Sequence, residues 1–234
     1  MSDERLEQLA RSHRLAADAS DRLCALLEIL ASDPQAPSAV TDRDAAIDRH
    51  VADSLSALAL PAVRDARAIA DIGSGAGLPG LALAIALPDA QVALVESVAK
   101  RCAFLERARR ATASDNATVV CVRAESWAEG IGAHDVVTAR AVGPLALLCE
   151  YAAPLLADGG TLVAWKGAAP AAERAAGDRA AAELGLEPAG AIRTRPYPGS
   201  ADHRLYAYVK TAETPARFPR RPGIARKRPL GAVR

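Results

Sequence analysis

Aromatic residues are scarce in this chain. They make up 3% of its 234 residues, although half of the residues are hydrophobic. The apolar positions are mostly Ala, Leu and Val, and no apolar run approaches the length that crosses a bilayer. So few rings argue against a protein that binds single-stranded nucleic acid mainly by stacking on its bases. The length fits one α/β domain with a substantial core and some additional segments.

Patterns typical of metal sites, disulfide frameworks and secretion are also missing. The four cysteines, Cys24, Cys102, Cys121 and Cys149, are scattered without a CxxC pair, so we expect buried, reduced thiols. The four histidines show no ligand spacing, and we therefore expect no metal. The N-terminus, MSDERLEQLARSHR, is charged and lacks the apolar stretch of a signal peptide. We expect a cytoplasmic protein that does not bind a membrane.

The net charge of +1 conceals an uneven distribution. Residues 193–234 carry 11 Lys and Arg against 2 Asp and Glu, a balance of +9. Residues 1–192 carry 18 against 26, a balance of −8. A basic end on an acidic body indicates a polyanionic partner near the C-terminus, and it is equally compatible with a solvated, arginine-rich tail.

Two helical stretches precede an alternation of strands and helices. Apolar residues recur at helical spacing over 5–31, and a capping box at Thr41 and Asp44 predicts the start of a second helix through 47–58. Strands are predicted over 66–73, 91–96, 117–122, 134–140, 159–167 and 204–210, and helices over 78–87, 97–110, 144–156 and 172–184. This alternation predicts a doubly wound, mostly parallel α/β sheet, with 204–210 as a candidate antiparallel strand.

The sequence DIGSGAGLPG at residues 71–80 places a glycine-rich turn between the first predicted strand and its helix. Gly73, Gly75 and Gly77 form GxGxG, and Leu78 stands where the dinucleotide fingerprint has its third glycine. Such a turn either folds back tightly or lets a ligand touch the backbone. The motif by itself is a weak signal, and a tight turn beside surface acids is the plainer alternative.

Two acidic residues make the ligand more specific. Asp71 precedes the turn, where a carboxylate would repel a pyrophosphate and attract an ammonium group. Glu96 ends the second predicted strand, the usual place for an acid that binds both ribose hydroxyls. A ligand with an adenosine, an amino group and no phosphate fits both positions. The pattern therefore indicates S-adenosylmethionine.

Short motifs in a fixed order extend over nearly the whole chain. They are RHVADSL (49–55), DIGSGAGLPGLALAIALPD (71–89), Glu96 with KRCAFL (100–105), RAES (123–126), ARA (139–141), WKG (165–167) and RRPGIARKRPL (220–230). In this order they resemble the family of ribosomal RNA small subunit methyltransferase G, also called glucose-inhibited division protein B. One departure is Glu96, where many members have Asp, and both residues can hold a ribose.

The resemblance implies a fold, a reaction and partners. The fold is a seven-strand, mostly parallel, Rossmann-like class I S-adenosylmethionine-dependent methyltransferase with an N-terminal helical extension. The implied reaction is methylation of guanine N7 at one site in the decoding region of 16S rRNA, with S-adenosyl-L-homocysteine as product. The implied partner is 16S rRNA, either in the small ribosomal subunit or in its assembly intermediate. We expect a monomer.

The resemblance also divides the chain into three segments. Residues 1–61 form a helical segment that packs on the core, residues 62–212 the methyltransferase domain, and residues 213–234 a basic, flexible arm. We expect this arm to be extended, without regular structure, because it is rich in Pro and has no apolar face. Its deletion from residue 217 is expected to weaken RNA binding and to spare cofactor binding.

Candidate site residues follow from the strand ends and from the family motifs. For the cofactor they are Asp71, Gly73, Gly75, Gly77, Leu78, Glu96, Ala124, Glu125 and Arg140. For positioning the substrate they are Arg140, His50, Lys166 and Lys100, and for binding RNA they are Arg123, Arg220, Arg221, Arg226, Lys227 and Arg228. A surface salt bridge is the alternative for any single strand-end cation, and a packing histidine for His50.

The chemistry of N7 methylation agrees with what the sequence omits. Residues 138–144 read TARAVGP, without the Asn/Asp-Pro-Pro-aromatic motif that holds exocyclic amines. Cys24 and Cys149 lie within predicted helices and are not placed as nucleophiles. Guanine N7 has a free lone pair and no proton, so we expect catalysis by alignment and no general base. A methyltransferase for small molecules or proteins, a nucleotide-dependent oxidoreductase and a non-catalytic RNA-binding module stay open as alternatives.

Overall fold

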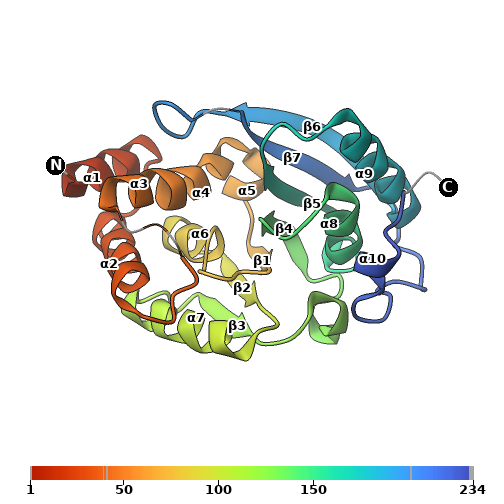
Figure 1. Cartoon of the computed structure of the whole chain (residues 1–234), viewed down its shortest axis with the longest axis horizontal. Helices are drawn as coiled ribbons and strands as arrows, with labels where there is room; N and C mark the ends of the chain where they lie inside the picture. Colours follow the sequence, from red (N-terminus) through yellow and green to blue (C-terminus); the bar gives the residue numbers. More distant parts are fainter. Residues whose placement is uncertain (1, 39, 41, 201, 232–234) are drawn as a thin grey trace.

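Seven strands form one sheet in the computed structural model, which describes residues 2–38, 40, 42–200 and 202–231 (Figure 1). They are β1 (Ala68–Ile72), β2 (Gln91–Val95), β3 (Ala117–Val120), β4 (His134–Arg140), β5 (Leu156–Lys166), β6 (Leu186–Thr194) and β7 (His203–Lys210). Their order is β3-β2-β1-β4-β5-β7-β6, and β1 to β5 pair in parallel. β7 is antiparallel to β5 and β6. The predicted Rossmann-like class I fold is confirmed.

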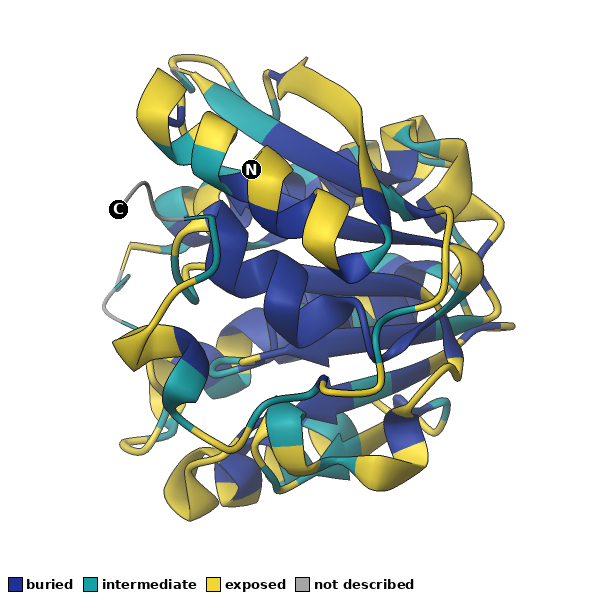
Figure 2. Cartoon of the chain, turned by 90° about the vertical axis from the view of Figure 1, so that its right-hand side faces the viewer, coloured by how far each residue is buried: buried dark blue, intermediate teal, exposed yellow. Residues whose placement is uncertain are grey.

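The core lies in two layers on the two faces of the sheet. Val136 of β4 belongs to a cluster with helix α6 (Gly80–Ala86) and helix α7 (Ala99–Ala111). Its neighbour Val137 belongs to a second cluster with helix α8 (Leu145–Ala152) and helix α9 (Ala171–Leu184). Successive side chains of a strand point to opposite faces, so these apolar strands are buried from both sides. Figure 2 shows the buried strands in the interior and the exposed residues on the outer helices and loops.

The N-terminal helices complete the first core layer. Helix α1 (Ser2–Ser12) and helix α2 (Ala19–Ser32) replace the single helical stretch expected over 5–31, because Arg14 has a φ of +56° and interrupts it. Leu6 and Leu23 are buried in the same cluster as α6. The N-terminal helices therefore pack on α6 and α7, which cover this face of the sheet, rather than form a core of their own.

A continuous helical run follows and confirms the predicted extent of the second helix. It consists of helix α3 (Arg43–Ala46), a π-helical turn (Ile47–Ala52), helix α4 (Asp53–Leu55) and a 3₁₀ turn (Ser56–Ala59), before helix α5 (Pro61–Arg64). Asp42 caps it by accepting a 2.7 Å hydrogen bond from the Ala45 N–H. The predicted cap Thr41 lies outside the described residues. π turns often occur at functional sites.

Strand β6 is missing from the prediction. Most of its residues are exposed, so its sequence lacks the apolar alternation that identifies a half-buried strand. Pro188 and Gly190 flank an irregularity in its pairing with β7. These are features of an edge strand, which proline interrupts at little cost.

The C-terminal residues are not the extended arm that we expected. Helix α10 (Ile224–Lys227) forms there, and Phe218 and Ala225 are buried against the core of α8 and α9. The expectation failed because a few apolar residues among many prolines and arginines show no period, yet they suffice to fill gaps in an existing surface. The division of the chain at residues 61 and 212 stays a prediction.

Two of the four cysteines form a disulfide. A disulfide joins Cys102, at the start of α7, to Cys121, just after β3, so the expectation of reduced thiols is wrong for this pair. Their separation of 19 residues did not predict the pairing, because only the packing of a helix beside the next strand brings the two cysteines together.

Within the described ranges, no helix is both long and apolar enough to cross a membrane.

Candidate functional site

Two neighbouring pockets lie at the carboxyl ends of the parallel strands, where ligands of such sheets bind. The larger has a volume of about 480 Å³ and lies at the ends of β4 and β5. The smaller, of about 80 Å³, lies at the ends of β1 and β2. Residues 141–143 separate them: Ala141 and Gly143 line the larger pocket and Val142 lines the smaller one.

The glycine-rich turn forms one wall of the smaller pocket. Gly73 has a φ of +69°, and a Cβ built there would lie 2.7 Å from Cγ2 of Val142. Both the backbone conformation and the close approach therefore require glycine. The Gly73 N–H donates a 2.8 Å hydrogen bond to the Val95 carbonyl, which holds the turn against the end of β2.

Glu96 faces the same pocket with its carboxylate fixed by backbone donors. Oε1 accepts hydrogen bonds from the N–H groups of Ser97 and Val98 at 2.7 and 2.9 Å. Oε2 accepts one from the Gly75 N–H at 3.1 Å, and Arg101 lies 3.7 Å from it. A carboxylate oxygen can accept two hydrogen bonds, so Oε2 has capacity for a ligand hydroxyl. Gly75 does not line the pocket itself but orients the carboxylate of Glu96, which does.

Asp71 lies beneath the turn rather than in a pocket. Its side chain is buried, accepting hydrogen bonds from the Thr138 hydroxyl at 2.8 Å and the Gly80 N–H at 3.2 Å. Burial raises the pKa of Asp71 to about 6, against the opposing effect of these hydrogen bonds. Leu78 and Gly77 also line neither pocket, and Leu78 packs in the core. Asp71, Gly77 and Leu78 therefore support the conformation of the turn and do not face either pocket.

The turn after β3 supplies the opposite wall of the smaller pocket. Arg123, Ala124 and Glu125 line it together with Tyr151 of α8. Arg123, which we assigned to RNA, thus lies where the cofactor candidates are. Arg226 of α10 lines this pocket as well.

One carboxylate organises the larger pocket. Asp53 accepts a 3.0 Å hydrogen bond from Nη1 of Arg140, at the end of β4, and lies 2.9 Å from Nδ1 of His203, at the start of β7. The indole N–H of Trp165, from β5, donates to the Asp53 carbonyl at 2.9 Å. Arg140 also donates to the Arg49 carbonyl at 3.1 Å. The N-terminal helices and three strands therefore meet at a single buried residue.

The remaining lining of the larger pocket offers hydrogen-bond donors. Among the described residues, the buried Oγ1 of Thr194 and the buried Nε of Arg204 have no hydrogen-bond partner. Lys166 donates to the Gly143 carbonyl at 3.0 Å and pairs with Glu173 at 2.8 Å. Thr194 and Arg204 line the pocket, but these two atoms are buried away from its surface, so the donor that faces the pocket is the half-buried Lys166.

His50 and Lys100 are the substrate candidates that the structure leaves outside both pockets. His50 lies in the π turn, with Nε2 2.9 Å from the Ser38 hydroxyl rather than paired with Asp53. Burial and the nearby Arg140 lower the pKa of His50, which favours the neutral ring. Lys100 is exposed in the first turn of α7.

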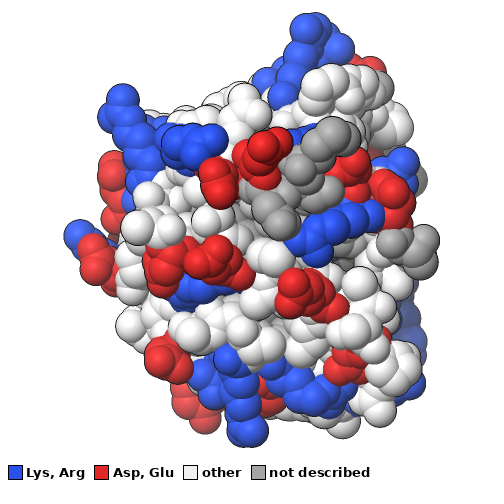
Figure 3. All heavy atoms as spheres, turned by 90° about the vertical axis from the view of Figure 1, so that its left-hand side faces the viewer, with Lys and Arg blue, Asp and Glu red and all other residues white. Residues whose placement is uncertain are grey.

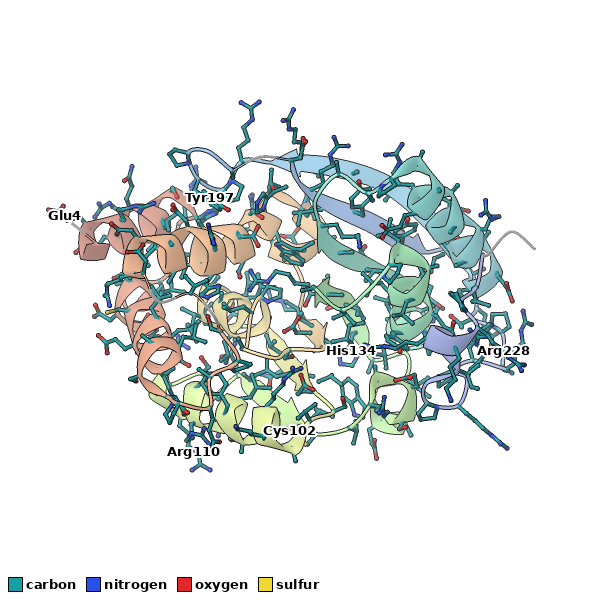
Figure 4. The ribbon with its side chains drawn as sticks, viewed as in Figure 1. Glu4, Cys102, Arg110, His134, Tyr197 and Arg228 are labelled. Atoms are coloured by element: carbon teal, nitrogen blue, oxygen red, sulfur yellow. A yellow bond between two sulfur atoms is a disulfide. The ribbon has the colours of Figure 1, made fainter. Side chains whose placement is uncertain are left out.

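The basic residues near the C-terminus divide into two kinds. Arg220 forms two hydrogen bonds, of 2.6 and 2.5 Å, to the buried carboxylate of Glu150, and is thus engaged within the protein. The other four candidates are exposed: Arg221, Arg226, Lys227 and Arg228. Figure 4 shows Arg228 at the end of the molecule that carries α8 and α10.

His203, Trp165 and Tyr151 belong to the site although the sequence did not single them out for it. Tyr197, in the loop before β7, has its ring edge-on to His203 with centroids 5.6 Å apart, and Figure 4 shows it beside the N-terminal helices. The only available signal was position, since His203 starts a strand and Trp165 lies near the end of one. For Tyr151, within a helix, the sequence carries no signal.

Solved structures share the fold. Fibrillarin from Aeropyrum pernix, in complex with S-adenosyl-L-methionine, has a TM-score of 0.54 at 19% identity, over 68% of this chain and 73% of that one. A predicted O-methyltransferase from Agrobacterium tumefaciens has a TM-score of 0.53 at 23% identity, over 69% and 80% of the two chains.

Sequence relatives are closer. A family profile described as rRNA small subunit methyltransferase G matches residues 37–191. The protein named ribosomal RNA small subunit methyltransferase G from Rubrobacter xylanophilus is 41% identical over 187 residues, 77% of this chain and 72% of the relative. The protein of that name from Chloroflexus aggregans is 42% identical over 196 residues, 82% of each chain. This chain belongs to the family of rRNA small subunit methyltransferase G.

Proposed function

We propose that this protein transfers a methyl group from S-adenosylmethionine to N7 of one guanine in the 16S rRNA of the small ribosomal subunit. The observation that supports it best is the pair of adjoining pockets, one with the Glu96 carboxylate for a ribose and one lined by Arg140 and Lys166, with only residues 141–143 between them. An rRNA substrate implies that the protein works in the cytoplasm. The family membership supports both the cofactor and the rRNA substrate.

The smaller pocket would hold the adenosine part of the cofactor. Oε2 of Glu96 has the capacity to accept a hydrogen bond from a ribose hydroxyl. The turn of Ala124 and Glu125 would lie beside the adenine, and Gly73 allows the backbone to approach closely. When bound, S-adenosylmethionine supplies an electrophilic methyl group on a sulfonium, which becomes a neutral thioether on transfer.

The larger pocket would hold the guanine. Its O6 is an acceptor beside N7 and suits a hydrogen-bond donor. N7 itself must stay free, because a donor bound to it would block attack. A cation close to N7 would also oppose the positive charge that the base gains. The Asp53 carboxylate neutralises Arg140, which precedes residues 141–143, and Glu173 neutralises Lys166, which contacts Gly143.

The chain needs no proton acceptor for this reaction. N7 attacks with its lone pair, so the residues contribute by fixing the base relative to the methyl group and excluding water. The network of Asp53, Arg140 and His203 joins α4, β4 and β7, and it would hold the larger pocket in one shape. His50, held by Ser38, would then support the π turn rather than touch the base.

Transfer of labelled methyl from S-adenosylmethionine tests the proposal. We expect label in 7-methylguanosine when small subunits from a strain lacking this activity are the substrate, and far less with Glu96→Ala. Naked 16S rRNA and an assembly intermediate, assayed in parallel, identify which form is methylated. Label in free guanosine or in protein, with none in rRNA, would contradict the proposed substrate.

A further inference from the structure

The C-terminal segment, defined here as residues 214–231, is attached at several separate points. The Thr214 hydroxyl lies 3.2 and 3.0 Å from the carbonyl oxygens of Ala153 and Leu184 and shares its one hydrogen between them. The Gly231 carbonyl accepts two hydrogen bonds from Arg179 of α9, at 3.0 and 2.7 Å. These contacts hold the two ends of the segment to the helices on one face of the sheet.

The middle of the segment is held as firmly. Arg220 binds the buried Glu150 of α8 through both carboxylate oxygens and donates to the Arg228 carbonyl at 2.8 Å. Phe218 is buried, and the guanidinium centres of Arg217 and Arg220 lie 5.0 and 5.9 Å from its ring centroid. Figure 1 shows α10 beside α8, far from the N-terminus. A bidentate, largely buried ion pair fixes the direction as well as the position of the chain.

This docking brings the segment to the smaller pocket. Gly223, with a φ of +81°, turns the chain and donates from its N–H to Oε1 of Glu125 at 3.1 Å. Arg226, one helical turn later, lines the pocket with Glu125 and Tyr151. Burial and Glu125 raise the pKa of Tyr151, and a hydrogen bond from Arg226 opposes this effect. The tail of the chain is therefore part of the wall of this pocket.

We propose that the C-terminal segment is a cofactor-binding element that closes the smaller pocket over the adenine, with Arg226 in contact with the base. This inference rests on the smaller pocket being the adenosine site. A planar guanidinium stacks well on an aromatic base, which gives arginine at this position a role that a bare positive charge would not have. The proposal reverses the expectation that deletion of the tail spares cofactor binding.

The closed pocket implies that the segment and the cofactor affect each other. With the segment docked, the pocket has a volume of about 80 Å³, so the segment must yield when adenosine enters and then close on it. Binding and docking are then linked, and linkage is reciprocal: whatever weakens docking weakens cofactor binding, and bound cofactor stabilises docking.

Titration of the full-length protein with S-adenosylhomocysteine, followed by calorimetry, tests the contact. We expect Arg226→Ala to weaken affinity about tenfold. The matched control is Arg221→Ala, which removes an exposed arginine of the same segment that lines neither pocket, and it should change affinity less than about twofold. Equal or tighter binding by Arg226→Ala would overturn the proposal, since the segment would then only obstruct the pocket.

Hydrogen exchange gives a readout that does not depend on a variant. S-adenosylhomocysteine should slow amide exchange in residues 217–229 of the unaltered protein, and exchange in the exposed strand β6 should stay the same. Unchanged exchange in 217–229, with affinity intact, would also overturn the proposal. Neither measurement involves rRNA, so a failure here leaves the proposed reaction untouched, and a failed methyl-transfer assay leaves this inference standing.

Discussion

Asp71 illustrates how a single residue serves the site without facing it. Its carboxyl group is buried beneath the glycine-rich turn and joins Thr138 of β4 to the first residue of α6. Such a group costs free energy when it is ionised, because burial removes water that the hydrogen bonds replace only in part. Because burial raises the pKa of Asp71 in the folded protein, the free energy of unfolding depends on pH.

Asp71→Asn should stabilise the protein relative to the wild type more at pH 8 than at pH 4. The pKa of Asp71 rises from 3.8 to about 6 on folding, so the wild type loses up to about 3 kcal/mol as pH rises through that window. The amide stays neutral. Its oxygen can accept a hydrogen bond from the Gly80 N–H while its N–H₂ group donates to the Thr138 hydroxyl. Urea unfolding of both proteins from pH 4 to pH 8 measures the difference, and a difference independent of pH would contradict a desolvated carboxyl group.

At the scale of an element, helix α8 connects the smaller pocket to the C-terminal segment. It provides Tyr151 to the smaller pocket, and its Glu150 holds the C-terminal segment through Arg220. Glu150 is 2% exposed, and its charge is balanced mainly by this one guanidinium. Removing one member of such a pair costs more than removing an exposed pair, because the other charge is left buried.

Arg220→Ala should therefore lower the free energy of unfolding by about 3 kcal/mol. The control is Arg217→Ala in the same segment, whose ion pair with Glu183 is exposed on both sides and should contribute less than about 1 kcal/mol. Chemical denaturation of the two variants gives the comparison. Similar losses for both would show that the Glu150 pair is no stronger than a surface pair.

Over the whole molecule, the sequence separates an acidic body from a basic end, and the fold places the last part of that basic end, helix α10, at the side that carries α8. Figure 3 shows acidic and basic side chains interspersed on the face that carries the N-terminal helices. The exposed Arg221, Lys227 and Arg228 lie instead with α10, beside the smaller pocket. Cations placed there can contact phosphates and stay away from N7.

Replacing Arg221, Lys227 and Arg228 together by Ala should reduce the salt dependence of binding to small subunits. A side chain that neutralises one phosphate contributes roughly 0.7–0.9 to the slope of log affinity against log salt, so the slope should fall by about 2. Arg110→Ala, on α7 and labelled in Figure 4, serves as an exposed control that should leave the slope unchanged. Filter binding at several salt concentrations measures it, and an unaltered slope in the triple variant would remove these residues from the rRNA interface.

The sequence by itself determined the alternation of strands and helices, the glycine turn and the position of Glu96. These features are local: a period of two or 3.6 residues, or a fixed distance from a strand end, is written in consecutive residues. The edge strand β6 and the docking of the C-terminal segment were missed because their apolar residues follow no period.

Only the tertiary structure decided which distant residues meet. Asp53 and His203 are 150 residues apart, and Arg220 and Glu150 are 70 apart. Cys102 and Cys121 pair because α7 packs beside β3, and Arg226 reaches the smaller pocket because its segment docks on α8. Such contacts depend on strand order and on the packing of helices across the sheet, which no local spacing encodes.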